Sequence, residues 1–257
     1  MRKYNNVILI LFFICVILFV IMLCIIAGIK DNRSNADEVS AETGFSDEKK
    51  SYKNASDKEQ KYNSGLLPGD GCDDDFIIML DAGHGGKDEG THFGDVYEKD
   101  IAMSVVNYMN EMLEDEGIHV ILTRRDDTFM KLKKRTDIAN NEGADLFVSI
   151  HCNYYEYDSQ IRGFECYYME GRCDSMEYAD SIVDYLEQAG RYTIRGVREE
   201  DFFVLRNTIS PAVLIELGYL SNKDERKKLA DDDYQKQLAE DIVRGIMQCK
   251  HNQNVLF

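Results

Sequence analysis

Residues 76–86 of the chain read FIIMLDAGHGG, an apolar run that ends in a glycine-rich turn containing His84. A short apolar run that stops at glycines predicts a buried β-strand. In α/β proteins the loops that follow such strands carry the chemistry. This stretch therefore favours an α/β fold with a functional site near His84.

The rest of the chain alternates between strand and helix patterns after the first expected strand, 76–80. The further expected strands are 118–123, 146–151, 162–168, 202–206 and 212–217, and the expected helices are 99–116, 131–143, 175–189 and 233–249. Such alternation predicts an α/β three-layer sandwich, with a mostly parallel mixed central sheet flanked by helices.

Composition and charge indicate a protein with one sizeable core that does not bind nucleic acid. The chain has 257 residues, of which 44% are hydrophobic and 30% charged, which is enough for one sizeable core. Its net charge of −17 argues against nucleic-acid binding through bulk electrostatics. We therefore expect no nucleic-acid partner, and we expect the acidic run 231–233 to be solvated surface.

The N-terminal part predicts a membrane segment and a linker. Residues 7–29 are almost wholly apolar, and a run of about 20 such residues can cross a bilayer. We therefore expect one transmembrane helix in an anchor at 1–29, a disordered polar linker at 30–75, a catalytic domain at 76–250 and a tail at 251–257. The alternative is a cleaved signal peptide, because residues 34–36 have the form of a cleavage site, although they lie beyond charged residues.

The cysteines give little support for a disulfide scaffold. There are seven, and those outside the apolar run are odd in number and irregularly spaced. Cys166 and Cys173 are candidates for a bridge if they flank a turn. Buried or free thiols are the favoured interpretation.

His84, Glu98 and His151 together make a His2Glu set, which is the ligand set of a catalytic zinc. Each residue alone has a simpler interpretation. His84 could be a turn residue or a phosphate contact, and His151 a core histidine; Glu98 could belong to a capping box begun by Asp95. Both histidines are expected at strand ends on one edge of the sheet, with Glu98 opening the next helix. This convergence predicts a site for one metal ion.

Glu216 lies inside an apolar strand, just before a glycine. An unpaired buried carboxylate is unfavourable, so it needs a partner or a raised pKa. A general base in a zinc hydrolase requires this kind of placement. The alternative is a buried salt bridge, for instance to Arg206 or Arg124.

Four motifs together resemble a known family. They are LDAGHGGK at 80–87, YEKD at 97–100, SIHCN at 149–153 and VLIELGYLSN at 213–222. In this order they are similar to the type-3 catalytic domain of zinc-dependent N-acetylmuramoyl-L-alanine amidases, over about residues 76–250. The resemblance implies that His84, Glu98 and His151 hold one Zn2+ ion and that Glu216 is the catalytic carboxylate. Ala82 stands where the family usually has proline, which alters the stiffness of the loop more than its chemistry.

The resemblance also implies a substrate, a reaction and a location. The substrate is peptidoglycan, and water cleaves the amide between N-acetylmuramic acid and L-alanine. The expected location is the cell membrane, single-pass, with the catalytic domain extracytoplasmic, or outside the cell after signal cleavage. The short tether without added wall-binding repeats looks like the spore-cortex, germination-specific branch that belongs to sporulation. A regulatory protein partner is plausible, and no residue identifies it.

Other functions fit the sequence less well. A zinc peptidase of another class lacks its His-Glu-x-x-His or His-x-x-Glu pair, and a serine hydrolase lacks its Gly-x-Ser-x-Gly turn. A Cys152 nucleophile is disfavoured because neighbouring strand residues face opposite sides, away from His151. A non-catalytic, membrane-tethered peptidoglycan-binding or regulatory homologue is the alternative from another class. All four expected site positions are occupied, which favours the enzyme.

Overall fold

The computed structural model of the chain describes residues 76–255. The expected anchor at 1–29 and linker at 30–75 therefore lie outside the described residues. Within 76–255, no helix combines the length and the apolar character needed to cross a membrane.

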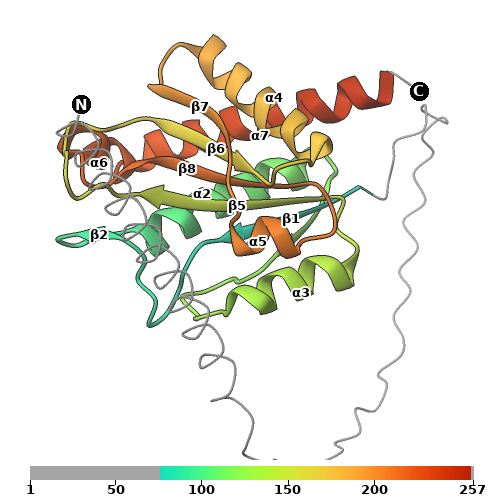
Figure 1. Cartoon of the computed structure of the whole chain (residues 1–257), viewed down its shortest axis with the longest axis horizontal. Coiled ribbons are helices and arrows are strands. Elements are labelled where there is room, and N and C mark those ends of the chain that lie inside the picture. The colour runs from blue at the N-terminus through green and yellow to red at the C-terminus, as the bar shows by residue number, and fades with distance from the viewer. Residues whose placement is uncertain (1–75, 256–257) are drawn as a thin grey trace, which may run out of the picture. The chain divides into compact units, whose positions relative to one another are not determined.

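A six-stranded sheet forms the centre of the described part (Figure 1). The strand order is β4 (His119–Leu122), β1 (Ile77–Ala82), β5 (Leu146–Asn153), β8 (Ala212–Tyr219), β6 (Phe164–Tyr168) and β7 (Ile194–Glu199). All neighbouring pairs run parallel except β6 and β8, which are antiparallel. The prediction of a mostly parallel mixed sheet is confirmed.

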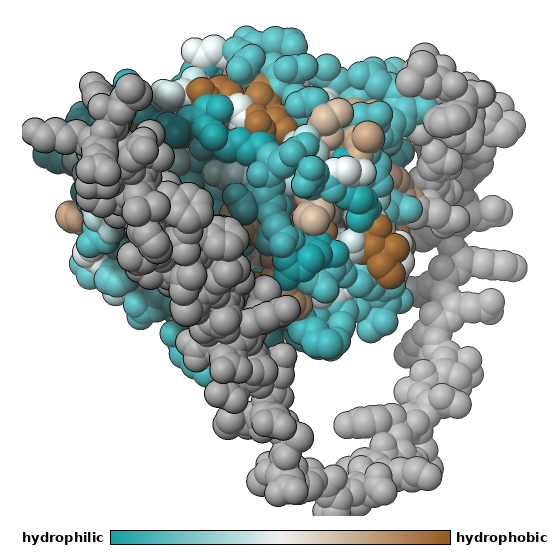
Figure 2. All heavy atoms as spheres, in the orientation of Figure 1, coloured by the Kyte–Doolittle hydropathy of each residue, from teal (hydrophilic) through white to brown (hydrophobic). Residues whose placement is uncertain are grey.

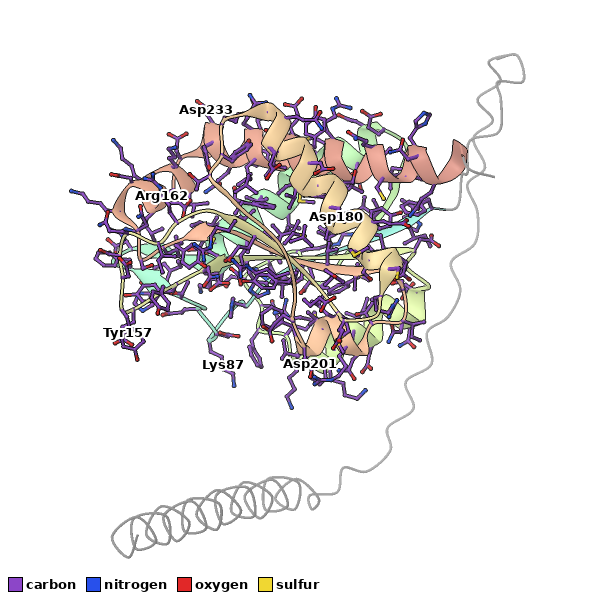
Figure 3. The ribbon with its side chains drawn as sticks, turned by 45° about the horizontal axis from the view of Figure 1, so that its top comes forward. Lys87, Tyr157, Arg162, Asp180, Asp201 and Asp233 are labelled. Carbon is purple, nitrogen blue, oxygen red and sulfur yellow. The ribbon has the colours of Figure 1, made fainter. Side chains whose placement is uncertain are left out.

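Helices flank this sheet on both faces, as expected for a three-layer arrangement (Figure 1). One face carries α2 (Glu98–Asp115), α4 (Cys173–Ala189) and α7 (Asp232–Val255), and the other carries α3 (Leu132–Glu142) and α5 (Phe203–Asn207). The short α6 (Lys223–Leu229) leads into α7. In Figure 3, Asp180 and Asp233 lie on the side of α4 and α7, and Lys87 and Asp201 on the side of α3 and α5.

Alternating side chains of the central strands build two cores. Ile78, Leu80 and Val148 belong to the large core beneath α2, α4 and α7, whereas Met79 and Phe147 belong to a smaller core beneath α3 and α5. A strand covered by helices on both faces is apolar along its whole length, which explains the continuous runs in the sequence. Hydrophilic residues dominate the outer face drawn in Figure 2.

Two sequence expectations fail in the region between α4 and β8. The strand expected at 202–206 is wrong, because Phe203–Asn207 form the short helix α5. A run of four apolar residues does not distinguish a strand from a buried helical turn. Strand β7 was not expected, because it lies at the sheet edge and alternates charged residues with few apolar ones.

Smaller elements also lie outside the sequence expectations. Two-residue strands β2 (His92–Phe93) and β3 (Val96–Tyr97) form a hairpin before α2, and α6 is a further unexpected helix. Helix α7 continues through Val255, beyond the end expected at 249 and into the segment expected to be a tail.

Parallel pairing brings the candidate site residues to one edge of the sheet. Strands β1, β5 and β8 run in the same direction, so their carboxyl ends lie together. His84 follows β1, and His151 on β5 is in register with Glu216 on β8. Glu98 is the first residue of α2. The topology therefore gathers residues that are far apart in the sequence.

Candidate metal centre

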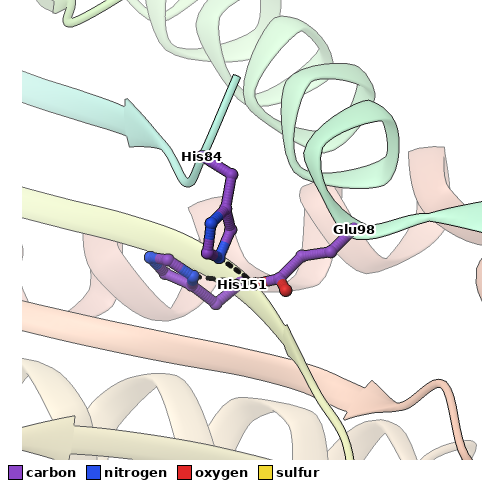
Figure 4. A group of neighbouring side chains, drawn as sticks. All are labelled: His84, Glu98 and His151. Atoms are coloured by element: carbon purple, nitrogen blue, oxygen red, sulfur yellow. Dashed lines mark hydrogen bonds and ion pairs between the residues drawn. The ribbon is translucent and has the colours of Figure 1, made fainter. Parts of the chain in front are cut away.

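The side chains of His84, Glu98 and His151 converge on one point (Figure 4). One carboxylate oxygen, Oε1 of Glu98, lies 3.0 Å from Nε2 of His84 and 2.8 Å from Nδ1 of His151. The candidate ligand atoms of all three residues lie within 4.8 Å of one another. The structure thus brings together the three residues that the sequence predicts as ligands.

This arrangement fits a zinc ion in donor type and in size. Two imidazole nitrogens and a carboxylate are the donors of a catalytic zinc with an open position. Two ligands of a tetrahedral zinc ion, each about 2.0–2.1 Å from it, lie about 3.3 Å apart. The observed separations of 2.8 and 3.0 Å are slightly shorter, so a small outward movement of the side chains admits the ion.

The backbone and a neighbouring carboxylate fix the orientation of His84. Its φ of 57° lies in the left-handed region, where it is the one non-glycine residue among those described. Asp88 Oδ1 lies 2.9 Å from Nδ1 of His84, which leaves Nε2 directed at Glu98. A carboxylate on the far nitrogen is the usual way a protein orients a metal-binding histidine.

Electrostatics at the site favour charged ligands in the metal-free state. Burial lowers the pKa of His84, but hydrogen bonding and the charges of Glu98 and Asp88 outweigh burial and raise it. Burial raises the pKa of Glu98, yet the hydrogen bonds of His151 and His84 bring it down to about 2. Glu98 is therefore ionised at any physiological pH and available to bind a cation.

Two glycines leave the space that the ligands occupy. A Cβ atom at Gly83 would collide with the imidazole ring of His151, and one at Gly90 would lie 2.5 Å from Oε2 of Glu98. These positions therefore require glycine because the ligands pack directly against the backbone.

The contacts of Glu98 exclude its simpler interpretation. Helix α2 is capped by Tyr97 without a side-chain hydrogen bond, so the capping box with Asp95 is wrong. The Glu98 carboxylate instead accepts hydrogen bonds from the backbone N–H groups of Thr91, at 2.7 Å, and Cys152, at 3.1 Å. These bonds hold the carboxylate between the two histidines.

Two arginines support the His84 loop, a role not expected from the sequence, where Arg124 was considered only as a partner of Glu216. The buried Arg135 donates to the carbonyl oxygens of Ala82 and His84, each at 2.6 Å, and pairs with Asp81 at 2.6 Å. Arg124 donates to the carbonyls of Ala82 and Gly83 at 3.0 and 2.9 Å. Their sequence context, a strand end and a basic helix, gave no signal of this role.

Glu216 lines the same cavity as the two histidines and has no ion-pair partner in the described part. Its Oε2 is buried and has no hydrogen-bond partner among the described residues. Burial, and then the negative charges of Glu98 and Glu165, raise the pKa of Glu216 well above its usual value. The expected alternative of a salt bridge fails, because Arg206 pairs with Asp201 and Arg124 bonds backbone carbonyls. An orphaned buried carboxylate is a candidate for proton transfer.

A cleft on the α3 and α5 side gives access to the centre. Two adjoining cavities of about 460 and 300 Å³ share His84, His151, Leu132 and Phe203. Glu216 and Glu98 line the smaller one, and apolar side chains, including Phe129 and Met130, line the larger. An apolar cleft with a few convergent polar groups is typical of a substrate site.

The cysteines take no part in this chemistry. Cys152, Cys166, Cys173 and Cys249 are free thiols in the described part, so the candidate bridge between Cys166 and Cys173 is absent there. Burial raises the pKa of Cys152 well above its usual value, which keeps the thiol protonated and unreactive.

A His2Glu cluster and an unpaired carboxylate at the carboxyl ends of the strands of an α/β sheet are typical of metal-dependent hydrolases. Comparison with known proteins specifies the family. Residues 78–248 match the family described as N-acetylmuramoyl-L-alanine amidase. The chain belongs to this family, and its described domain is an amidase of the bacterial cell wall.

Relatives of known sequence or structure support the assignment. The chain is 37% identical over 172 residues to the uncharacterized protein YqiI of Bacillus subtilis, covering 66% of this chain and 82% of YqiI. It is 36% identical over 172 residues to the probable cell wall amidase LytH of Staphylococcus aureus, covering 66% of this chain and 56% of LytH. It therefore spans only about half of LytH.

A solved structure extends the comparison to three dimensions. The CwlD amidase of Clostridioides difficile, in complex with the GerS lipoprotein, is 35% identical and superposes with a TM-score of 0.66. The similarity covers 69% of this chain and 99% of CwlD. The predicted mixed α/β sheet flanked by helices, the enzyme class and the amide-cleaving function are thereby confirmed at the level of the family.

Proposed function

We propose that this chain cleaves the amide between N-acetylmuramic acid and L-alanine in peptidoglycan with one zinc ion held by His84, Glu98 and His151. The observation that carries the proposal is the convergence of these side chains within 4.8 Å of one another, with the unpaired carboxylate of Glu216 in the adjoining cleft. We assign Glu216 as the catalytic carboxylate.

The residues divide the work of hydrolysis between them. A bound zinc ion supplies Lewis acidity, which polarises a carbonyl and makes water more acidic. Oε2 of Glu216, which has no hydrogen-bond partner in the described part, takes a proton from the attacking water. Glu216 then returns this proton to the leaving L-alanine amine. The pKa of Glu216 is raised in the metal-free protein, and a divalent cation bound nearby would lower it and so favour the ionised form that a base requires.

The test separates metal binding from proton transfer. The full-length chain, purified in detergent, is assayed for zinc and for new L-alanine amino ends released from muropeptides. We expect one zinc per chain and turnover in the wild type, zinc without turnover in Glu216→Gln, and loss of both in His84→Ala. Wild-type protein that holds no zinc or releases no L-alanine ends would contradict the proposal. Normal hydrolysis by Glu216→Gln would remove that residue from its role.

The proposed location is the cell membrane, with the amidase domain on its outer side. The apolar run 7–29 is long enough to span a bilayer, and the similar protein LytH is a probable cell wall amidase. Fractionation of cells and digestion of intact protoplasts test this. We expect the domain in the membrane fraction and accessible to protease, whereas domain released into the medium with a new N-terminus would favour signal cleavage.

The preferred form of the wall is a separate proposal. We propose spore cortex as the preferred substrate, because the sequence resembles the germination-specific branch of the family. A lipoprotein partner of the kind seen with CwlD fits a membrane-tethered amidase. Zymography on isolated cortex and on vegetative wall tests the substrate preference, and preferential clearing of vegetative wall would contradict it.

A further inference from the structure

Two arginines on the edge strand β7 converge on a single carboxylate. Arg195 and Arg198 are three residues apart, so in a regular strand their side chains would point to opposite faces. The register between β6 and β7 shifts between Phe164 and Glu165, and Gly196 has a φ of 99°. Such a bulge redirects side chains. As a result, Nε of each arginine lies 2.9 Å from the same oxygen, Oε1 of Glu165.

The Glu165 carboxylate between the arginines is buried, and both of its oxygens have polar partners. The Glu165 side chain is 2% exposed, and its Oε2 accepts hydrogen bonds from Tyr219 at 2.6 Å and Asn153 at 3.2 Å. Burial raises the pKa of Glu165, but hydrogen bonds from Tyr219 and Arg195 more than offset this and lower it. Glu165 is therefore an anion that positions the arginines through their Nε atoms.

One negative charge does not neutralise two guanidinium groups. The side chains of Arg195 and Arg198 are 32% and 45% exposed, and their terminal Nη atoms make no hydrogen bond within residues 76–255. The pair thus presents a net positive charge and several free donors to solvent. This stands out in a chain whose net charge is −17.

The pair lies beside the proposed catalytic carboxylate. Glu165 on β6 is in register with Glu216 on β8, and Asn153, which lines the cleft, donates to Glu165. Neighbouring strands are about 4.8 Å apart, so β7 lies about 10 Å from β8. An extended peptide covers about 3.4 Å per residue. A stem held with its scissile bond at Glu216 therefore reaches the arginines with its second or third residue.

Two aromatic side chains lie between the cleft and the arginines. Phe202 lines the cleft and packs edge-on against Tyr167, with ring centroids 5.3 Å apart. Tyr167 is in register with Arg198. An apolar floor that ends at a positively charged group suits a peptide whose first residue is L-alanine and whose following residues are acidic.

We propose that Arg195 and Arg198 form a carboxylate-binding subsite that recognises an acidic residue of the peptide stem, two or three residues from the amide that is cleaved. This inference rests on the proposed function of the Glu216 cleft and adds a specificity determinant to it. Guanidinium groups bind carboxylates through charge-assisted, often bidentate hydrogen bonds. The Nη donors of the two arginines supply those bonds.

The test compares three muropeptides with a full-length enzyme. One stem carries free carboxylates on its second residue, glutamate, and its third, diaminopimelate; the other two are amidated on the second or on the third. We expect amidation at one of the positions to lower wild-type kcat/KM by about 10- to 100-fold, the range for one hydrogen bond to a charged group. We define the selectivity as the ratio of kcat/KM for the free stem to that for the amidated stem. In Arg198→Gln and Arg195→Gln this ratio should fall towards one, mainly through a change in KM, and Arg198→Lys should retain part of the selectivity.

A matched control distinguishes recognition from support of the strand. Arg244 is 47% exposed and pairs with Glu116 at 2.8 Å on the helical layer of α7, so Arg244→Gln removes a similar ion pair and should keep the full selectivity. Equal loss of rate on all three substrates in the β7 variants, or wild-type rates that ignore amidation, would overturn the subsite while leaving the amidase assignment intact. A wild-type enzyme that cleaves none of the three would overturn the proposed function, and the subsite with it.

Discussion

His84 combines an unfavourable backbone conformation with a position at the centre of the site. A non-glycine residue at a φ of 57° is unusual, and such residues cluster where surrounding structure enforces them. Here the enforcing groups are the Arg135 donor to its carbonyl and the Asp88 carboxylate at its ring. The strain is compensated by contacts that also direct Nε2 towards the metal.

Replacement of Gly83 tests how tightly the ligands pack. The added methyl group of Gly83→Ala collides with the His151 ring, so we expect zinc affinity and turnover to fall by at least about tenfold, the range for disturbed metal-site support. Far-UV circular dichroism should remain that of the wild type. Cys173→Ala, at an exposed free thiol, is the control. A Gly83→Ala enzyme with normal zinc content would contradict the packing argument.

Removal of Arg135 tests the support of the His84 loop. Arg135→Leu leaves Asp81 buried and unpaired, which costs about 3–5 kcal/mol of folding free energy and frees the carbonyl of His84. Urea unfolding measures the loss. The exposed Arg125→Leu should change stability by less than about 0.5 kcal/mol. If Arg135→Leu were equally harmless, the buried pair would not support the loop.

The pH dependence of zinc affinity follows from the His84 pKa. Zinc binds the neutral imidazole, and the pKa of His84 is raised in the metal-free protein, so protons compete at a pH above the usual histidine range. Affinity should be highest above the raised pKa and decline as pH falls through it, by about tenfold per pH unit for each proton displaced. Competition with a chelating dye measures this affinity. A zinc affinity that does not change between pH 8 and pH 6 would contradict the prediction.

At the scale of elements, parallel pairing is what makes the site predictable from sequence. The strand ends at His84 and His151 could be recognised from apolar runs, and parallel strands place such ends on one edge. The bulge of β7 could not be foreseen, because it depends on pairing between Phe164 and Ile194 that no local pattern encodes. For the same reason the Glu165 cluster was missed. Helix α5 was mistaken for a strand because its short apolar run fits either element.

The end of α3 offers a test of element stability apart from chemistry. Gly143 terminates the helix at a φ of 67°, with open space around its Cα. Gly143→Ala should therefore destabilise the domain by about 1 kcal/mol through backbone strain alone. Urea unfolding should show this shift while kcat and KM remain unchanged. A change in KM would mean that α3 communicates with the cleft through its end.

At the scale of the whole molecule, the net negative charge contrasts with a few basic side chains near the site. The net charge is −17, yet basic side chains concentrate beside the cleft at Arg195 and Arg198 and beneath the loop at Arg124 and Arg135. The buried pair stabilises ligand geometry, and the exposed pair is available for substrate. Local basic side chains of this kind let a protein with a net negative charge bind an acidic group.

The central claim, a zinc ion held by His84, Glu98 and His151, is tested most directly by diffraction from crystals of the zinc-loaded protein at the zinc absorption edge. The account predicts one strong anomalous peak between Nε2 of His84, Nδ1 of His151 and the Glu98 carboxylate, with ligand distances of about 2.0–2.2 Å. Zinc-loaded crystals with no peak there, or with the only peak at another site, would contradict it.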